Sequence, residues 1–249
     1  MQHRVDVGGV IRRVLNIYVD QASVLMPAAA VVFVFTGIIA ALLVVASPGL
    51  ALLALLIDLI AGTLFTGMVV ELVADVQDGR RDSSPGQLLR AVTPVLGQLI
   101  LVGLIAGIGI VIGFVLIIIP GLFLITIWSV AAPVVVLENP GALAALRRSR
   151  ELVRGNGWQV FGVILVLYVV VAVVSFILDA AAESAGSGAG IVVRVIVGVL
   201  AAPLAALAAS VLYFELRGPA PSQAPGDIGT GAGAPPTAGG PDAERAFGG

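Results

Sequence analysis

The sequence predicts an all-α, polytopic integral membrane protein with six transmembrane helices and short cytoplasmic interfacial helices. Of its 249 residues, 59% are apolar and 11% are charged, whereas globular domains average about 45–50% and about 25%. Several apolar runs exceed the roughly 18 residues that a helix needs to cross hydrocarbon. Membrane β-strands would instead give short segments of alternating hydrophobicity, so helices are favoured.

Six apolar segments have the length and composition of membrane spans. Ser47-Pro48-Gly49 is a turn signal after the first segment, and Pro120-Gly121 is predicted to form the turn after the third. The fourth segment is short for a bilayer, so a re-entrant segment is the alternative to a full crossing. Pro133 is expected to kink it. The predicted spans are residues 24–46, 50–73, 95–119, 122–137, 158–178 and 189–214.

These spans define a six-helix membrane domain over residues 1–217. Residues 218–249 are rich in Gly, Pro and Ala. Such a segment cannot bury enough apolar surface to offset the entropy of ordering it. It is therefore predicted to be a disordered cytoplasmic tail.

Two short amphipathic helices are predicted at the membrane surface. In residues 5–20, apolar side chains recur at helical spacing. This helix either lies in the headgroup plane or packs on its own protein, and the sequence leaves both open. The second helix is predicted between an Asn139-Pro140 start and a Gly155 stop. Its polar face carries Arg147 and Glu151, which are spaced to pair.

Three segments resemble one another and suggest an internal repeat. They begin at Gly8, Pro85 and Pro140, continue as a short Arg-bearing helix, and lead into a membrane hairpin. The hypothesis is three units, each with one surface helix and two spans. Chance similarity between apolar segments is the alternative, and a three-fold pseudo-symmetric arrangement would distinguish the two.

The arginines predict the orientation in the membrane. All thirteen basic residues are arginine, and twelve fall on one side of the predicted spans. Under the positive-inside rule, both termini and the Arg-rich loops are cytoplasmic. The predicted location is the cell membrane, with multiple passes.

Asp58 is the one acidic residue well inside a predicted span, and Arg194 lies in the outer half of the sixth span. Charges in hydrocarbon usually face a partner, a water cavity or the interior of a helix bundle. An intramembrane Asp58–Arg194 ion pair is therefore a hypothesis. The alternatives are an ion or substrate path, snorkelling, and an unpaired protonated Asp58.

The second surface helix and its neighbours form a candidate surface for anionic headgroups or a protein partner. Its residues are Glu138, Arg147, Arg148, Arg150, Glu151, Arg154 and Trp158. Glu71, Glu138 and Glu215 fall at cytoplasmic span ends near arginines. Simple ion pairing at the interface is the alternative to a headgroup site.

The sequence offers few side chains suited to catalysis. The chain has no cysteine, and His3 is its one histidine. We find no phosphate loop, zinc-ligand spacing or catalytic triad. The sequence therefore predicts no catalytic, metal or cofactor-binding residues, no enzyme activity and no nucleic-acid partner.

The stretch from Pro120 to Gly162 carries a family resemblance. Pro120-Gly121, Trp128, Pro133, Glu138 and the segment ALRRSRELVRGNGW resemble the membrane domain of bacterial glycerophosphoryl diester phosphodiesterases, and the likeness extends over about residues 5–217. In those enzymes the membrane domain is fused to a catalytic barrel with histidines and metal-binding carboxylates. The present chain is expected to lack that barrel, so the resemblance implies a stand-alone membrane domain without phosphodiesterase activity.

These observations together predict a non-enzymatic membrane scaffold or a partner- or lipid-binding module. Its expected partners are membrane lipids with anionic headgroups, another membrane protein, or a second copy of the chain. The alternative is a small transporter or lipid-handling protein with a polar path near Asp58. A water-filled cavity that reaches Asp58 would favour transport.

Overall fold

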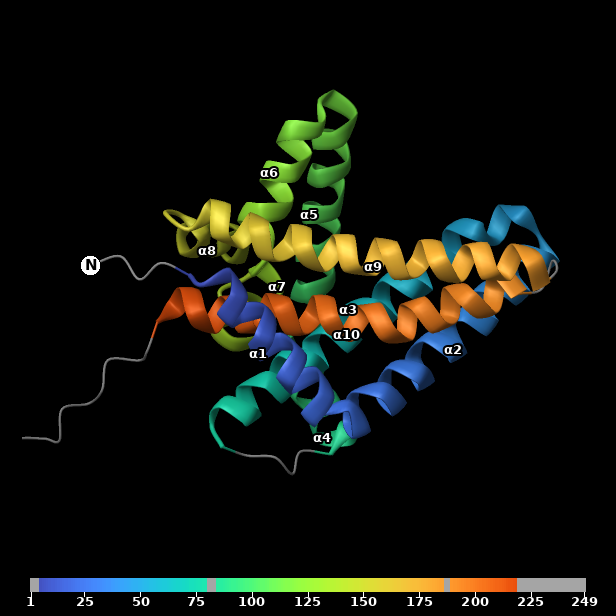
Figure 1. Ribbon diagram of the computed structural model, residues 1–249, viewed down its shortest axis with the longest axis horizontal. Coiled ribbons are helices and arrows are strands. Elements are labelled where there is room, and N and C mark those ends of the chain that lie inside the picture. Colours follow the sequence, from blue (N-terminus) through green and yellow to red (C-terminus); the bar gives the residue numbers. More distant parts are fainter. Residues whose placement is uncertain (1–4, 80–83, 186–188, 219–249) are drawn as a thin grey trace, which may run out of the picture. The chain divides into compact units, whose positions relative to one another are not determined.

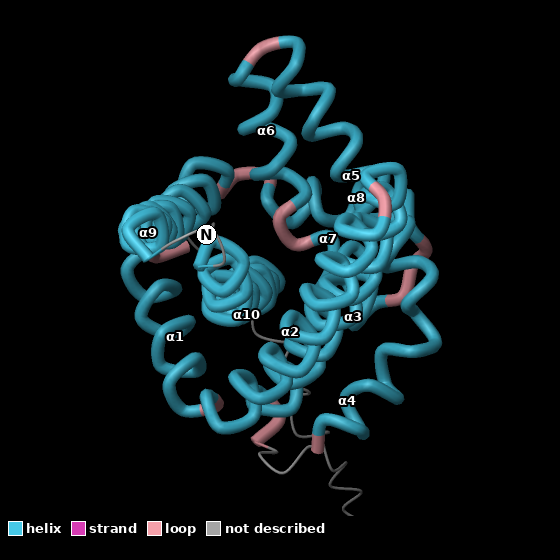
Figure 2. The backbone as a smooth tube through the Cα atoms, turned by 90° about the vertical axis from the view of Figure 1, so that its right-hand side faces the viewer, coloured by secondary structure: helices cyan, strands magenta, loops and turns pink. Residues whose placement is uncertain are grey.

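The computed structural model describes residues 5–79, 84–185 and 189–218, apart from the side chains of residues 85, 179, 181–185, 189–192 and 194. This part of the chain is helical and contains no strand (Figures 1 and 2). The all-α prediction is confirmed. The α-helices are α1 (Val7–Asp20), α2 (Ala22–Ala46), α3 (Ala51–Gln77), α4 (Pro85–Val92), α5 (Leu96–Leu116), α6 (Ile118–Trp128), α7 (Ala131–Glu138), α8 (Ala142–Val153), α9 (Gly157–Ala185) and α10 (Ala189–Arg217).

Six segments of the described chain are long and apolar enough to cross a membrane, which confirms the predicted number. Many of their apolar side chains face outward, and Val45 and Val115 are more than four-fifths exposed. Lipid contact explains such surfaces, which soluble monomers avoid. The segments are Ala22–Ala46, Pro48–Gln77, Gly86–Leu116, Ile118–Glu138, Gly157–Leu178 and Val195–Arg217.

The helices follow the three-unit order that the repeat hypothesis predicts. Each unit has a short amphipathic helix and a pair of long helical segments: α1 with α2 and α3, α4 with α5 and α6–α7, and α8 with α9 and α10. The two long segments of each unit pack on each other. In Figures 1 and 2, α5 lies beside α6 and α9 lies beside α10.

Packing between the units is cyclic. The second segments of the units, α3, α7 and α10, contact one another. Each amphipathic helix packs on the preceding unit: α1 on α9 and α10, α4 on α3, and α8 on α5, α6 and α7. The first long helices do the same, with α2 on α10, α5 on α3 and α9 on α6. This arrangement supports three pseudo-equivalent units over chance similarity.

The central helices bury their apolar side chains against one another. Val70 and Val73 of α3, Val134 of α7, and Val211 of α10 are fully buried. Gly67 lets α4 approach α3 closely, because a Cβ there would lie 2.5 Å from Cγ1 of Val92. In α3 and α10, the buried side chains therefore lie mainly in the C-terminal half of each helix.

The helix predicted in residues 5–20 packs on the protein itself. It starts after Asp6, whose carboxylate accepts a 3.1 Å hydrogen bond from the Gly8 amide. Val10 and Val14 are buried, and the Tyr18 hydroxyl donates to the Leu200 carbonyl of α10 at 3.2 Å. Burial raises the pKa of the Tyr18 hydroxyl. These contacts support packing over a helix that lies free in the headgroup plane.

The turn between α5 and α6 lies three residues before its predicted position. Ile117 is extended, and α6 begins at Ile118. Pro120 fits the first turn of α6, because an amide there would have no partner within the helix. A Cβ on Gly113 would lie 3.0 Å from the backbone of Gly121. Gly121 therefore serves helix–helix contact instead of the turn.

The segment predicted at 122–137 is broken, as its proline suggested. α6 ends at Trp128 and α7 begins at Ala131, with Pro133 in the first turn of α7. The Ile127 carbonyl, near the end of α6, accepts a 2.8 Å hydrogen bond from the Ser149 hydroxyl of α8. α8 is thereby fixed against the end of α6.

The predicted start of α8 at Asn139-Pro140 is wrong. Asn139 has φ 47° and ψ 46° and caps the end of α7, while α8 begins at Ala142 after Gly141. Asparagine tolerates the left-handed region better than most residues, so the same residue type signals both helix ends. The predicted stop at Gly155, with φ 96°, is confirmed.

Candidate functional site

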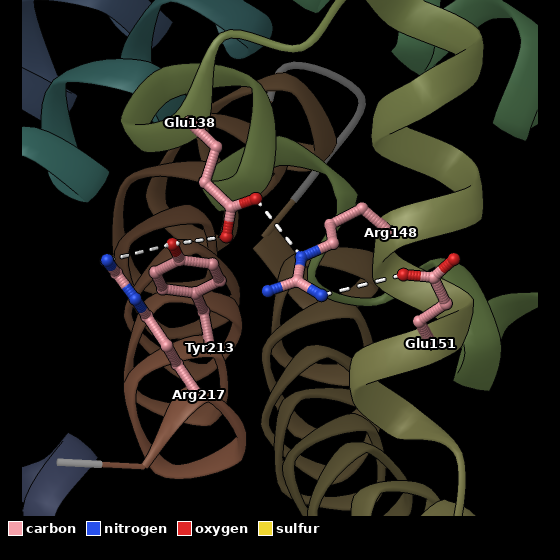
Figure 3. Close-up of polar contacts among 5 residues, drawn as sticks. All are labelled: Glu138, Arg148, Glu151, Tyr213 and Arg217. Carbon is pink, nitrogen blue, oxygen red and sulfur yellow. Dashed lines mark hydrogen bonds and ion pairs between the residues drawn. The ribbon is translucent and has the colours of Figure 1, made fainter. Parts of the chain in front are cut away.

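A polar cluster joins α7, α8 and α10 at the ends of these helices (Figure 3). Glu138 is at its centre. Its Oε1 accepts a 2.9 Å hydrogen bond from the Tyr213 hydroxyl, and its Oε2 accepts a 3.2 Å hydrogen bond from Nε of Arg148. Arg148 also pairs with Glu151 at 3.5 Å. Nη1 of Arg217 donates to the Tyr213 oxygen at 3.3 Å. We call these five residues the Glu138 cluster.

Tyr213 and Arg217 are the two residues of this cluster that the candidate surface predicted from the sequence did not include. Tyr213 lies near the end of the sixth span, where aromatic side chains favour the headgroup level, but its side chain is fully buried. A buried hydroxyl needs a hydrogen-bond partner, and Glu138 of α7 provides one. Tyr213 therefore ties two central helices together.

The predicted Arg147–Glu151 pair is wrong, because Glu151 pairs with Arg148 instead. Arg148 is half-buried beside Glu138, whereas Arg147 is exposed on the other side of the helix. The i,i+4 spacing made Arg147 a possible partner of Glu151. The packing of α8 on α7 instead places Arg148 beside both Glu138 and Glu151.

Three arginines of the candidate surface are exposed: Arg147, Arg150 and Arg154. We call them the α8 arginine face. Each is without an ion pair to any carboxylate in the described part of the chain. Trp158, four residues beyond Arg154, is 84% exposed. The surface thus combines uncompensated positive charge with a large exposed aromatic side chain.

A second set of polar contacts joins α1 to α10 and α3. Nη1 of Arg13 on α1 pairs with Glu215 of α10 at 2.8 Å, and its Nη2 donates to Gln77 of α3 at 3.1 Å. With the Glu138 cluster, these contacts bring together the C-terminal ends of α3, α7 and α10. Glu71 is half-buried and has no ion pair with a described residue, so the expected interface pairing is found for Glu138 and Glu215.

Asp58 is exposed on α3 and forms no hydrogen bond or ion pair with a described side chain. The Arg194 side chain lies outside the described residues, so the Asp58–Arg194 pair stays a hypothesis. Asp58 lines neither of the two larger cavities described next.

Two apolar cavities flank α6. The larger, about 830 Å³, lies between α6 and the start of α9 and includes Phe123, Ile127, Gly155 and Trp158. We call it the α6–α9 groove. The smaller, about 320 Å³, is an open pocket lined mainly by residues of α6, α9 and α10. Both are lined mainly by hydrocarbon side chains.

Metal binding has no support in the described residues, which contain no group of three or more His, Cys, Asp or Glu side chains placed to hold an ion. The arrangement of the site is that of a charged surface beside apolar grooves.

The six apolar helices and this charged end define a polytopic α-helical membrane protein. Residues 88–216 match the model of a family described as a domain of unknown function, DUF8558, and the chain belongs to that family. The match runs from α4 to α10 and includes the α8 arginine face and the α6–α9 groove.

A second similarity also points to the membrane. A 101-residue segment is 36% identical to a UPF0259 membrane protein of Pectobacterium carotovorum subsp. carotovorum (strain PC1). The segment covers 39% of this chain and 39% of that relative, so the chain spans well under half the length of the protein it matches. No solved structure matches the chain. Neither match names the glycerophosphoryl diester phosphodiesterase membrane domain.

Proposed function

We propose that this protein is a non-enzymatic membrane module that binds anionic phospholipid headgroups through its α8 arginine face. The observation that carries the proposal is the lack of any described carboxylate partner for Arg147, Arg150 and Arg154. Each basic residue near an acidic leaflet contributes about 1 kcal/mol of attraction. Three arginines on one helix would therefore favour anionic lipids over neutral ones.

The Glu138 cluster holds this surface in position. Arg148 is neutralised by Glu138 and Glu151 on the protein side, while the other arginines of α8 point to solvent. Arg148 alone makes the ion pair that attaches α8 to α7. The remaining arginines make no such contact within the described chain, which supports a role for them in binding.

The proposal includes an orientation with both termini in the cytoplasm. Its support is the gathering of Arg-bearing helices α1 and α8 at one end of the central helices, which the positive-inside rule assigns to the cytoplasmic side. An acidic patch on another membrane protein, or on a second copy of the chain, would present the same chemistry to α8 and is a competing outcome of the test below.

We further infer that the family is related to the membrane domain of glycerophosphoryl diester phosphodiesterases. The support is that the residues of the resemblance have structural roles here: Gly121 in close helix contact, Pro133 at the helix break, and Glu138 in the polar cluster. A module of this kind would act as a membrane scaffold.

The test compares lipid enrichment around two charge-matched variants. The protein is reconstituted in nanodiscs of phosphatidylcholine with a minority of phosphatidylglycerol, and bound lipid is counted by native mass spectrometry. Arg150→Gln/Arg154→Gln should lose most of the phosphatidylglycerol enrichment. The control Arg12→Gln/Arg90→Gln removes two exposed arginines that lie on two different helices and should lose less of the enrichment, because these arginines do not act together on one surface.

Equal enrichment in both variants would overturn the headgroup site on α8. If phosphatidylglycerol is not enriched around the wild type at all, but a second chain is retained by α8 in a charge-dependent way, the surface binds protein instead of lipid.

A further inference from the structure

The α6–α9 groove has the size and form of a site for an elongated apolar ligand. Its volume of about 830 Å³ falls in the range of about 300–1,000 Å³ for ligand pockets. Its wall on α6 runs from Ile119 to Ile127, a rise of about 12 Å at 1.5 Å per residue. Trp158 and Phe161 of α9 supply aromatic surface on the opposite side.

The two ends of the groove differ in chemistry. At one end, the Ser149–Ile127 hydrogen bond holds α8 against α6, and Gly155, which follows Arg154 directly, lines the groove. At the other end lie Ile119 and the α5–α6 turn, where the exposed side chains are isoleucines. The groove thus runs from Gly155, the residue after the α8 arginine face, to an apolar end at the α5–α6 turn.

We propose that the α6–α9 groove binds one acyl chain of an anionic membrane phospholipid whose headgroup contacts Arg150 and Arg154. This inference rests on the headgroup binding proposed above and adds the chain site. The arginines of α8 come before Gly155, and the apolar wall of α6 follows. This sequence of a charged and then an apolar surface matches the headgroup and acyl chain of such a lipid. Trp158, exposed and part of the groove lining, takes the position that amphipathic aromatics prefer at headgroup level. A neutral lipid would fill the groove but leave the arginines uncompensated.

Quenching of Trp158 fluorescence by brominated lipids tests the proposal. The chain has two tryptophans, and the other, Trp128, packs against Gly109, so Trp128→Phe isolates the signal of Trp158. Phosphatidylglycerol with a brominated acyl chain is mixed into phosphatidylcholine nanodiscs, and brominated phosphatidylcholine is the comparison. The anionic lipid should reach half-maximal quenching at a several-fold lower mole fraction. Coincident curves would overturn the proposal.

The same measurement separates failure of this inference from failure of headgroup binding. Adding Arg150→Gln/Arg154→Gln should move the phosphatidylglycerol curve onto the phosphatidylcholine curve. If native mass spectrometry shows arginine-dependent enrichment but the two quenching curves coincide, headgroup binding stands and the chain site is refuted. If neither measurement distinguishes the lipids, both proposals are refuted.

Photolabelling of the wild type keeps the proposal testable if Trp128→Phe fails to fold. Phosphatidylglycerol with a diazirine at mid-chain should label residues 119–127 and 157–161 more strongly than the exposed apolar stretch 169–177 of α9, which samples ordinary lipid contact. Equal labelling per residue in both regions contradicts a specific chain site.

Discussion

Arg13 and Glu215 lie 202 positions apart in the sequence and form a 2.8 Å ion pair between α1 and α10. Arg148 and Glu138 make the corresponding contact between α8 and α7. In both, an arginine of an amphipathic helix meets a glutamate at the end of a central helix of the preceding unit. The two ion pairs therefore follow the cyclic packing of the three units, and they fix α1 and α8 to the C-terminal ends of α10 and α7.

The Arg13–Glu215 pair should stabilise the fold modestly. Its side chains are 47% and 31% exposed, and exposed ion pairs contribute about 0.2–1 kcal/mol. A double-mutant cycle with Arg13→Gln and Glu215→Gln, measured by unfolding in mixed micelles, should give a coupling free energy in that range. Arg12→Gln is the matched control because Arg12 is exposed, and it should leave stability unchanged. A coupling of zero would mean that α1 is held by its apolar face alone.

Tyr213→Phe should lower the free energy of unfolding more than any other tyrosine-to-phenylalanine change in α9 and α10. The hydroxyl is buried and donates to a carboxylate, and hydrogen bonds to charged groups contribute about 1.5–3 kcal/mol. Thermal unfolding in detergent should show a lowered Tm for this variant. Tyr168, 71% exposed on α9, provides the control, since Tyr168→Phe should leave the Tm unchanged. Equal effects at both positions would indicate that the Glu138 cluster does not form.

Gly113→Ala should destabilise the α5–α6 hairpin. The added Cβ would lie 3.0 Å from the backbone of Gly121, which cannot move aside as a flexible side chain can, and overpacking of this kind costs about 1–3 kcal/mol. Gly107 is on the same helix with nothing within 4 Å of a Cβ, so Gly107→Ala should be neutral. Both are measured by unfolding in mixed micelles. Comparable losses for the two variants would show that the close approach of Gly113 to Gly121 is not the cause.

Features that depend on composition over many residues were predictable from the sequence, and features that depend on single turns were not. The six spans follow from long apolar runs, which no local signal overrides. The prediction that α8 starts at Asn139 was wrong because an asparagine can also end a helix in the left-handed conformation, as Asn139 ends α7. The prediction of a turn at Pro120 was wrong because a helix accepts proline in its first turn. In each case the residue type fits two positions, and only packing selects between them.

Glu138 and the charged residues of α8 were predictable as candidate site residues, but their partners were not. The arginines of α8 and Glu138 stand out because charges are rare in this chain. The choice of Arg148 over Arg147 and the burial of Tyr213 follow from how α7, α8 and α10 meet. Contacts between segments so distant in sequence leave no spacing pattern, so they could not be inferred from one sequence.

The hypothesis of an Asp58–Arg194 ion pair predicts a specific pattern of rescue. Asp58 is exposed on the surface of α3 in a segment that can cross the membrane, where an uncompensated charge is costly by about 2.5–3.5 kcal/mol or more. If Arg194 compensates it, Asp58→Arg and Arg194→Asp should each reduce the yield of folded protein in membranes. The charge-swapped double variant should then recover much of it, because it restores one positive and one negative group. Yield is measured by size-exclusion chromatography of detergent-solubilised membranes, with Asp58→Asn as a control for loss of charge alone. A double variant that is no better than either single change rules the pair out, which leaves an ion or substrate path, snorkelling, or an unpaired protonated Asp58.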